Sequence, residues 1–344
     1  MRPLAALLAL LVLPAAPSSS GKMVLVAGKA LNEPFGVAFG PAGNTYIVEM
    51  GGNRVSVVGK DGRRSVLAGT GEKGLGGDGG PAAQARFNGP HHLLMSEDGR
   101  HLYVADTFNN CVRRIDLKTG IVTRFAGTGE KGFSGDGGSA LAARFGGIFA
   151  IALRGGRLYL CDLDNRRVRA VDLETGVVTT VAGNGEKGLP QDGGGAVTQP
   201  LVDPRAIALD SKGNLYICER GGNALRVVDT AGRIRTVAGT GEAGFSGDGG
   251  PARDAKLQGP KHISVDGADN VLISDTENHV IRLYSPSDGT IRRIAGTGAK
   301  GSAGLGGPPE ACQLDRPHGA VVNPNDGSLY ISDSENHRVI RIDK

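Results

Sequence analysis

A glycine-rich segment recurs along the chain at nearly constant spacing, and this repeat limits the possible folds more than any other feature. Its fullest copy is AGTGEAGFSGDGGPA at residues 238–252, and related copies begin at residues 68, 126, 182 and 295. Only the opening Ala-Gly is present at residue 27, so successive copies are 41, 58, 56, 56 and 57 residues apart. A long, regular period is typical of solenoids and propellers, in which each repeat is one supersecondary unit.

Each repeat contains four short apolar segments with the pattern of β-strands. In the fifth repeat they are residues 262–265, 271–274, 280–284 and 290–294. β-branched residues alternate with polar ones in these segments, and turn sequences such as GADN and SPSDG separate them. Four antiparallel strands per repeat, in six repeats, predict an all-β fold, the six-bladed β-propeller.

The last repeat has only three such segments, and the missing one lies at the other end of the chain. The sequence MVLVA at residues 23–27 has the form of a fourth strand. We expect this N-terminal strand to complete the last blade, because closing the ring removes an exposed sheet edge. The propeller is therefore predicted to span residues 22–344.

The first residues have the order of an export signal. Arg2 precedes an apolar run at residues 4–13, and small residues follow as far as Gly21. This order predicts a signal peptide at residues 1–20, whose apolar run is too short to span a bilayer. We expect a monomeric protein without a membrane span, exported to the periplasm or the extracellular space.

The four cysteines do not have the pattern of a disulfide framework. Export permits disulfides, but Cys161 and Cys218 occupy a position at which other repeats have Ala105, Ser274 or Ser332. Small residues at this position indicate packing between blades, so we expect free, buried thiols.

Charge and motif context exclude two classes of function. The net charge of +4 comes from 39 basic and 35 acidic residues without a run of five like charges, whereas nucleic-acid binding needs a clustered basic face. The segment that begins at Gly239 fits GxGxxG, but a dinucleotide site needs a full helix after this motif. Residues 251–257 leave room for one or two helical turns only.

The strand sequences identify a family resemblance. YVADTFNNCVRRID at residues 103–116 and YISDSENHRVIRID at residues 330–343 resemble the NHL repeat, and the AGTG…GDGGPA linkers resemble its bacterial exported members. The resemblance implies a propeller fold over the whole repeat region. It implies no single activity, because NHL propellers include protein-binding and RNA-binding modules, adhesion ectodomains and, more distantly, peptide-amidating lyases.

Two sets of acidic residues follow the repeat. One set lies in the glycine loops, at Asp78, Asp136, Asp192 and Asp248. The other lies between the second and third strands, at Glu49, Asp106, Asp162, Glu219, Asp275 and Asp333. Ca²⁺ needs about six to eight oxygen ligands, and each loop supplies one carboxylate. We therefore interpret both sets as turn-forming residues that bind nearby backbone N–H groups.

A third set of residues departs from the repeat and is the candidate site. Proline opens five of the six inner strands, and Ile148 takes its place in blade three. The two residues after this position are, in blade order, Phe35-Gly36, His91-His92, Phe149-Ala150, Arg205-Ala206, Lys261-His262 and His318-Gly319. In a closed ring these positions surround the mouth of the central channel. The predicted ligand-binding residues are His91, His92, Arg205, Lys261, His262 and His318.

This register is compatible with two kinds of site. Converging imidazoles are typical of Zn²⁺ or Cu²⁺ sites, for which the candidate ligands are His91, His318 and His262. The amidating lyases have zinc-binding Pro-His pairs here in three blades, whereas this chain has Pro204-Arg205 in blade four. Strand alternation also turns His92 and His262 away from His91 and His318. Without metal, His beside Arg and Lys forms a carboxylate pocket.

Three functions therefore remain open at this point. The first is a binding or scaffold module whose loop-rich face takes a protein, peptide or carbohydrate. The second is a metal-dependent lyase or hydrolase at the channel mouth. The third is a structural protein whose channel mouth is plugged by Phe35 and Phe149.

Overall fold

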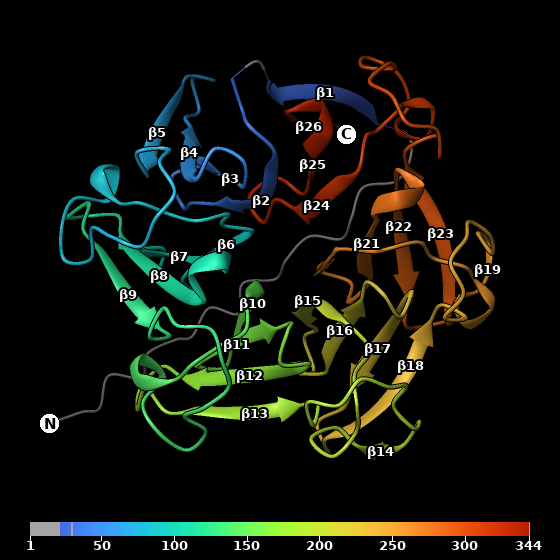
Figure 1. Ribbon diagram of the computed structural model, residues 1–344. Helices are drawn as coiled ribbons and strands as arrows, with labels where there is room; N and C mark the ends of the chain where they lie inside the picture. Colours follow the sequence, from blue (N-terminus) through green and yellow to red (C-terminus); the bar gives the residue numbers. More distant parts are fainter. Residues whose placement is uncertain (1–20, 29, 344) are drawn as a thin grey trace, which may run out of the picture.

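The computed structural model describes residues 21–28 and 30–343 and confirms the six-bladed β-propeller (Figure 1). Six antiparallel sheets surround a central axis, and the inner strand of each sheet lies nearest to that axis. The predicted signal peptide lies outside the described residues. Among those residues, no helix is long and apolar enough to cross a membrane.

The first three blades each contain four strands, from the channel outward. Blade one consists of β2 (Pro34–Phe39), β3 (Thr45–Glu49), β4 (Arg54–Val58) and β5 (Arg64–Ala68). Blade two consists of β6 (His92–Met95), β7 (His101–Asp106), β8 (Cys111–Asp116) and β9 (Val122–Ala126). Blade three consists of β10 (Ile148–Arg154), β11 (Arg157–Asp162), β12 (Arg167–Asp172) and β13 (Val178–Ala182).

The other three blades have the same order with additions at their outer edges. Blade four consists of β15 (Pro204–Leu209), β16 (Leu215–Glu219), β17 (Ala224–Val228), β18 (Arg233–Ala238) and β14 (Gly194–Gly195). Blade five consists of β20 (His262–Val265), β21 (Val271–Asp275), β22 (Val280–Ser285), β23 (Thr290–Ala295) and β19 (Gly250–Pro251). Blade six consists of β24 (Pro317–Val322), β25 (Leu329–Asp333), β26 (Arg338–Asp343) and β1 (Lys22–Ala27).

The N-terminal strand closes the ring, as predicted. β1 runs antiparallel to β26, with Lys22 opposite Asp343 and Leu25 opposite Ile340. Met23 is fully buried, and its backbone also binds the last glycine loop through Met23 N–H to Gly307 O at 3.0 Å. The first strand therefore joins both the last sheet and the last loop.

Each glycine loop folds across the outer edge of the following blade. In blade five, β19 pairs with β23, and a 3-10 turn at Ala252–Asp254 follows it. Equivalent 3-10 turns lie at Ala82–Gln84, Ala140–Ala142 and Pro309–Ala311. Further 3-10 turns join the second and third strands at Thr107–Asn109, Thr276–Asn278 and Ser334–Asn336. The predicted one or two helical turns in the loops are therefore single 3-10 turns.

The recurring Ala-Gly doublet has a steric cause. Gly127 has a φ of +92°, and a Cβ at this position would lie 2.4 Å from the carbonyl oxygen of Asn110. Only glycine combines a positive φ with such a close approach of backbone. The doublet therefore marks the point where the chain leaves each outer strand.

Buried arginines hold the glycine loops in place. In blade five, Arg282 is fully buried and donates to the backbone carbonyls of Ser246 and Lys256 at 2.8 and 2.9 Å. Its Nε lies 2.9 Å from a carboxylate oxygen of the loop residue Asp248, and it also faces Asp275 at 3.5 Å. Arg113 and Arg169 at the same strand position, and Arg338 two residues earlier in its strand, also donate to loop carbonyls. Arg226 instead binds Glu219 and Thr236.

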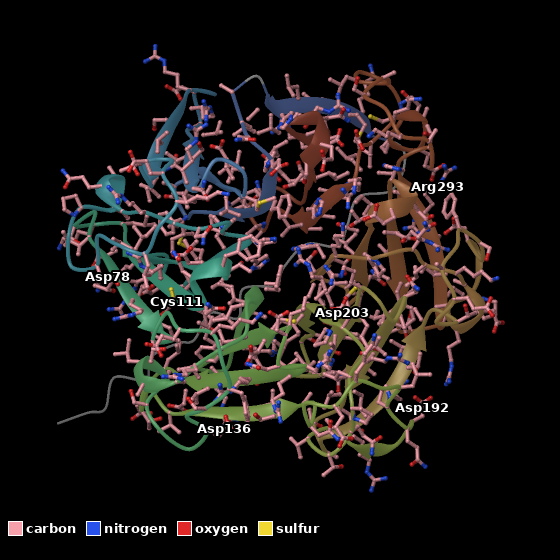
Figure 2. All side chains as sticks on the ribbon, viewed as in Figure 1. Asp78, Cys111, Asp136, Asp192, Asp203 and Arg293 are labelled. Atoms are coloured by element: carbon pink, nitrogen blue, oxygen red, sulfur yellow. The ribbon has the colours of Figure 1, made fainter. Side chains whose placement is uncertain are left out.

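The two periodic acidic sets are structural, as expected, although the partners of the loop set differ from those expected. Asp78 and Asp136 bind Arg113 and Arg169 of the following blade rather than their own backbone. Asp192 binds Thr236 and Arg253 instead. These loop carboxylates lie toward the rim of the propeller (Figure 2).

The second acidic set fastens the start of each inner strand. Asp106 accepts a hydrogen bond of 2.8 Å from the backbone N–H of Asn88, and Asn109 also donates to it at 2.8 Å. Asp162, Asp275 and Asp333 make the same pair of contacts in their blades. All four cysteines are free and buried, as predicted.

Candidate functional site

In blades one, three, four and six, the second residue of the inner strand sits at an irregularity in the sheet, whereas His91 and Lys261 come directly before β6 and β20. In blade four, Pro204 pairs with Glu219 and Ala206 pairs with Cys218, so Arg205 is skipped by the ladder. Phe149 and His318 are skipped in the same way. A β-bulge redirects a side chain out of the regular alternation, and here it directs these residues to the channel mouth. We call the six residues at this position the hub ring: Phe35, His91, Phe149, Arg205, Lys261 and His318.

Aromatic contacts close much of the hub ring. The rings of Phe35 and His318 stack with centroids 3.9 Å apart. His91 meets Phe35 and Phe149 edge to face at 5.0 and 4.7 Å. The guanidinium of Arg205 lies over the Phe149 ring at 4.4 Å. Phe35 and Phe149 therefore pack against the imidazoles and narrow the channel mouth.

The two hub-ring histidines have a defined tautomer. Nδ1 of His91 lies 2.7 Å from the carbonyl oxygen of Gly89, and Nδ1 of His318 lies 2.8 Å from that of Arg316. A carbonyl oxygen only accepts, so each Nδ1 carries the hydrogen and each Nε2 has a free lone pair. Such histidines can accept a proton or a hydrogen bond at Nε2, or ligate a metal there.

Arg205 is the least satisfied charge in this part of the molecule. It is 5% exposed, and within the described residues its guanidinium has neither an ion pair nor a hydrogen bond. Burial lowers the pKa of Arg205 to about 10, and the nearby positive charge of Arg220 acts in the same direction. A buried cation without a counter-ion or hydrogen bond is costly to the fold, and an anionic ligand at this point would reduce that cost.

Lys261 completes the positive side of the hub ring. Its Nζ lies 2.7 Å from a carboxylate oxygen of Glu277, which Arg316 also contacts at 2.7 Å. Burial, together with the positive charges of Arg205 and Lys261, holds the pKa values of His91 and His318 well below their usual range. The hub ring therefore presents neutral imidazoles in a positive electrostatic field.

His92 and His262 form a separate level inside the channel. They come from opposite blades, and their Nε2 atoms lie 3.3 Å apart. Each Nδ1 faces the inner strand of the next blade, at 3.5 Å from the backbone N of Ile151 for His92 and 3.4 Å from that of Ala320 for His262. We call these two residues the channel pair.

The predicted site residues are thus divided between two levels. His91, Arg205, Lys261 and His318 share the hub ring, and the channel pair lies beneath them, as strand alternation predicted. His262 meets His92 and does not complete a set with His91 and His318. In residues 21–28 and 30–343, no three His, Cys, Asp or Glu side chains are grouped so that they could hold a metal ion. The predicted Zn²⁺ or Cu²⁺ triad is therefore not assembled.

The loop-rich face carries a pocket that sequence reasoning missed. It has a volume of about 480 Å³ and lies between blades three and four. Its lining includes the basic residues Arg166, Lys187 and Arg220 and the acidic residues Asp164 and Asp203. We call it the loop-face pocket. Figure 2 places Asp203 near the centre of the ring, and the charges of Asp203 and Arg220 both act on Arg205.

One sequence signal could have pointed to this pocket. Blade four is the only blade whose inner strand has arginine directly after the proline, and the preceding loop has the altered text GLPQDGGGA. Arg166 and Arg220 also lie at turn positions that have Asn and Thr in other blades, for example Asn110 and Thr276. At three positions, therefore, this chain has a basic residue where other blades have a different residue. The overall composition does not show this clustering, but an alignment of the repeats does.

Acid is expected to destabilise the fold through the channel pair. Burial and the charge of Arg205 lower the pKa of His92 to about 4, and burial holds the pKa of His262 well below its usual range. Unfolded histidine titrates near about 6.5, so between these pH values the unfolded chain binds more protons than the folded chain. His92 alone should cost about 3 kcal/mol of unfolding free energy as the pH falls from 6.5 to 4.

Urea unfolding at several pH values measures this effect. The double variant His92→Leu/His262→Leu should lose a clear part of the pH dependence below pH 6.5, and the buried histidines His91 and His318 should account for a further part. His101→Leu removes a histidine that is 23% exposed at the start of β7 and should keep the wild-type slope. Equal slopes in all three proteins would contradict the expectation.

Comparisons with known proteins agree with this architecture. A family model described as NHL repeat matches residues 314–342. The chain is 26% identical over 342 residues to NHL repeat-containing protein 2 of Gallus gallus, an alignment that covers 86% of this chain and 44% of that protein. The chain therefore spans less than half the length of this relative.

Solved structures share the fold at low sequence identity. An auxiliary nutrient binding protein from Bacteroides thetaiotaomicron superposes with a TM-score of 0.65 at 15% identity, covering 96% of this chain and 75% of that one. A catalytically inactive virginiamycin B lyase from Staphylococcus aureus, with quinupristin, gives 0.55 at 15% identity, covering 94% and 99%. At this identity the likeness concerns the fold alone, which suits a binding or scaffold module and also hosts enzymes.

Proposed function

Because this chain is a six-bladed β-propeller of the NHL-repeat kind, we propose that it is an exported binding module whose loop-rich face recognises an anionic group on a partner. The partner is a protein, a peptide or a carbohydrate that presents a carboxylate. The channel mouth and the loop-face pocket together form the proposed binding surface. Export follows from the predicted signal peptide at residues 1–20.

The observation that carries this proposal is the unpaired guanidinium of Arg205. Arginine offers a planar array of donors that matches a carboxylate, and no protein group in the described residues occupies that array. The adjoining loop-face pocket is lined by three basic and two acidic residues, so it adds positive charge. A bound carboxylate would supply the missing counter-charge.

Replacing Arg205 with leucine should separate binding from stability. We expect Arg205→Leu to weaken binding of the tripeptide Ala-Ala-Ala at least about tenfold, because a charge-assisted hydrogen bond contributes about 1.5–3 kcal/mol. The free energy of unfolding should stay the same or rise, because an uncompensated buried charge is removed. Isothermal titration calorimetry and urea unfolding measure the two effects.

Two controls sharpen this test. The C-terminal amide of the same peptide lacks the carboxylate and should bind wild-type protein no better than the Arg205→Leu variant binds the acid. Arg63→Leu removes a guanidinium that is 90% exposed beside β5 and should change neither quantity. Equal binding of acid and amide, or a large loss of stability with unchanged binding, would reject the proposal.

A metal-dependent lyase or hydrolase at the channel mouth is the second candidate. It is favoured by the free Nε2 lone pairs of His91 and His318. The residues present do not fit a three-ligand metal site, because Arg205 stands where the third ligand is expected. Metal analysis of the purified protein distinguishes the candidates: stoichiometric zinc or copper that is lost in His91→Ala and His318→Ala supports the enzyme, and metal-free protein supports the binding module.

A further inference from the structure

Below the channel pair, the inner strands enclose a cavity of about 320 Å³. His92 and His262 line one end of it, and residues at the far ends of the inner strands, such as Met95 and Val265, line the other. Every inner strand starts at the loop-rich face, so this cavity extends toward the opposite face of the propeller. We call it the lower channel.

The wall of the lower channel is apolar. The inner-strand residues two positions beyond the channel-pair register are Ala38, Leu94, Ala152, Ala208, Ser264 and Val321. The single hydroxyl among them, that of Ser264, already donates to the carbonyl oxygen of Ala320 at 2.7 Å. An apolar wall with a few polar groups at one end is typical of small-molecule sites of about 300–1,000 Å³.

The tautomers of the channel pair leave two donors at the inner end of this cavity. Backbone N–H groups point at Nδ1 of both His92 and His262, so neither Nδ1 can carry a hydrogen in a neutral ring. Both Nε2 atoms then carry hydrogens, and they face each other at 3.3 Å. Two N–H donors cannot bind each other, but one acceptor atom within reach of both can satisfy them.

The charge near this point favours an anionic acceptor. Arg205 has no counter-ion among the described side chains, and its positive charge acts on both His92 and His262. No carboxylate of the described chain lines the lower channel. An incoming carboxylate would therefore meet two N–H donors and a positive field, and its aliphatic tail would lie against the apolar wall.

We propose that the lower channel binds an aliphatic monocarboxylate, with one carboxylate oxygen accepting hydrogen bonds from Nε2 of His92 and of His262. This site lies on the side of the channel pair away from the loop-rich face, so it is distinct from the proposed partner-binding surface. The ligand enters from the face opposite the glycine loops. Its class is a fatty acid of medium length, which the cavity volume accommodates.

Titration of the full chain with octanoate tests the proposal. Octanoate should bind with a stoichiometry of one, and octylammonium, which has the same tail and the opposite charge, should not compete. His92→Leu/His262→Leu should weaken octanoate binding at least tenfold, because the donors are lost while the side-chain volume is kept. Ala152→Phe should also abolish binding by filling the cavity without touching either histidine.

Two further measurements keep the outcome unambiguous. Long-range ¹H–¹⁵N spectra should show hydrogens on Nε2 of both histidines, and a hydrogen on either Nδ1 would overturn the proposed donor pair even if the variants unfold. Ala152→Phe should leave peptide binding at Arg205 unchanged, so failure of one site is distinguishable from failure of the other. Octanoate that does not bind, or that binds equally to the Ala152→Phe variant, would overturn the proposal.

Discussion

Replacing Arg282 with alanine is expected to lower the free energy of unfolding by about 3–5 kcal/mol, the usual cost of removing one partner from a buried ion pair. The side chain is fully buried and binds two loop carbonyls as well as Asp248. Its removal also leaves Asp275, which is fully buried, without its counter-charge. The glycine loop between blades four and five should lose its attachment at the same time.

Chemical denaturation measures this loss, and two variants serve as references. Arg292→Ala removes an exposed arginine from β23 of the same blade and should stay within about 0.5 kcal/mol of wild type. Arg282→Lys keeps the charge but cannot reach two carbonyls and a carboxylate at once, so it should recover only part of the loss. A loss for Arg282→Ala no larger than that for Arg292→Ala would show that the loops are held by other means.

Truncation of Met23 should produce the second large loss of stability, because this buried side chain attaches the closing strand β1 to the core of blade six. Met23 is fully buried in a cluster with Leu272, Ile281 and Leu314. Met23→Ala is expected to lower the free energy of unfolding by about 2–5 kcal/mol, as for other large-to-small core changes. Hydrogen exchange should increase first in β1 and β26, because these strands lose their shared core contact.

Leu25 offers a matched control on the same strand. Its side chain is 50% exposed, so Leu25→Ala should change the free energy of unfolding by less than about 0.5 kcal/mol. If the two variants were equally stable, closure would depend on the β1–β26 hydrogen bonds alone and not on the buried side chain.

The fold could be predicted from the sequence because its signals are local and repeated. The predicted strand at residues 262–265 is β20 as observed, and the other three strands of that blade end one residue later than predicted. The closing strand was predictable because the last repeat lacked one strand. Alternation of polar and apolar residues fixes such elements without knowledge of the partners they meet.

The partners of charged residues could not be predicted in the same way. Arginine recurs at the position of Arg282 in the third strand of four blades, yet the sequence does not show that Arg282 reaches a loop about 26–36 residues away. Asp78 and Asp136 were expected to bind their own backbone, but the adjacent blade brings an arginine within reach. Contacts of this kind depend on how neighbouring blades pack.

The sequence predicted which positions of the inner strands form the candidate site, but not which of their side chains contact one another. The six residues that depart from the repeat do gather at the channel, as the closed ring requires. Their division into two levels follows strand alternation, whereas the β-bulges at residues such as Arg205 have no signal in the sequence. The contact between His92 and His262 joins residues 170 positions apart and requires the full geometry of the ring.

The position of β1 has a mechanical consequence. Lys22 lies directly opposite Asp343, so the two ends of the described chain leave blade six at the same corner. A force that pulls residues 21 and 343 apart would load the hydrogen bonds between β1 and β26 one rung at a time, as a zipper opens, instead of shearing them together. The ring should therefore open at a lower force when it is pulled at these two ends than when β1 is pulled along its own length.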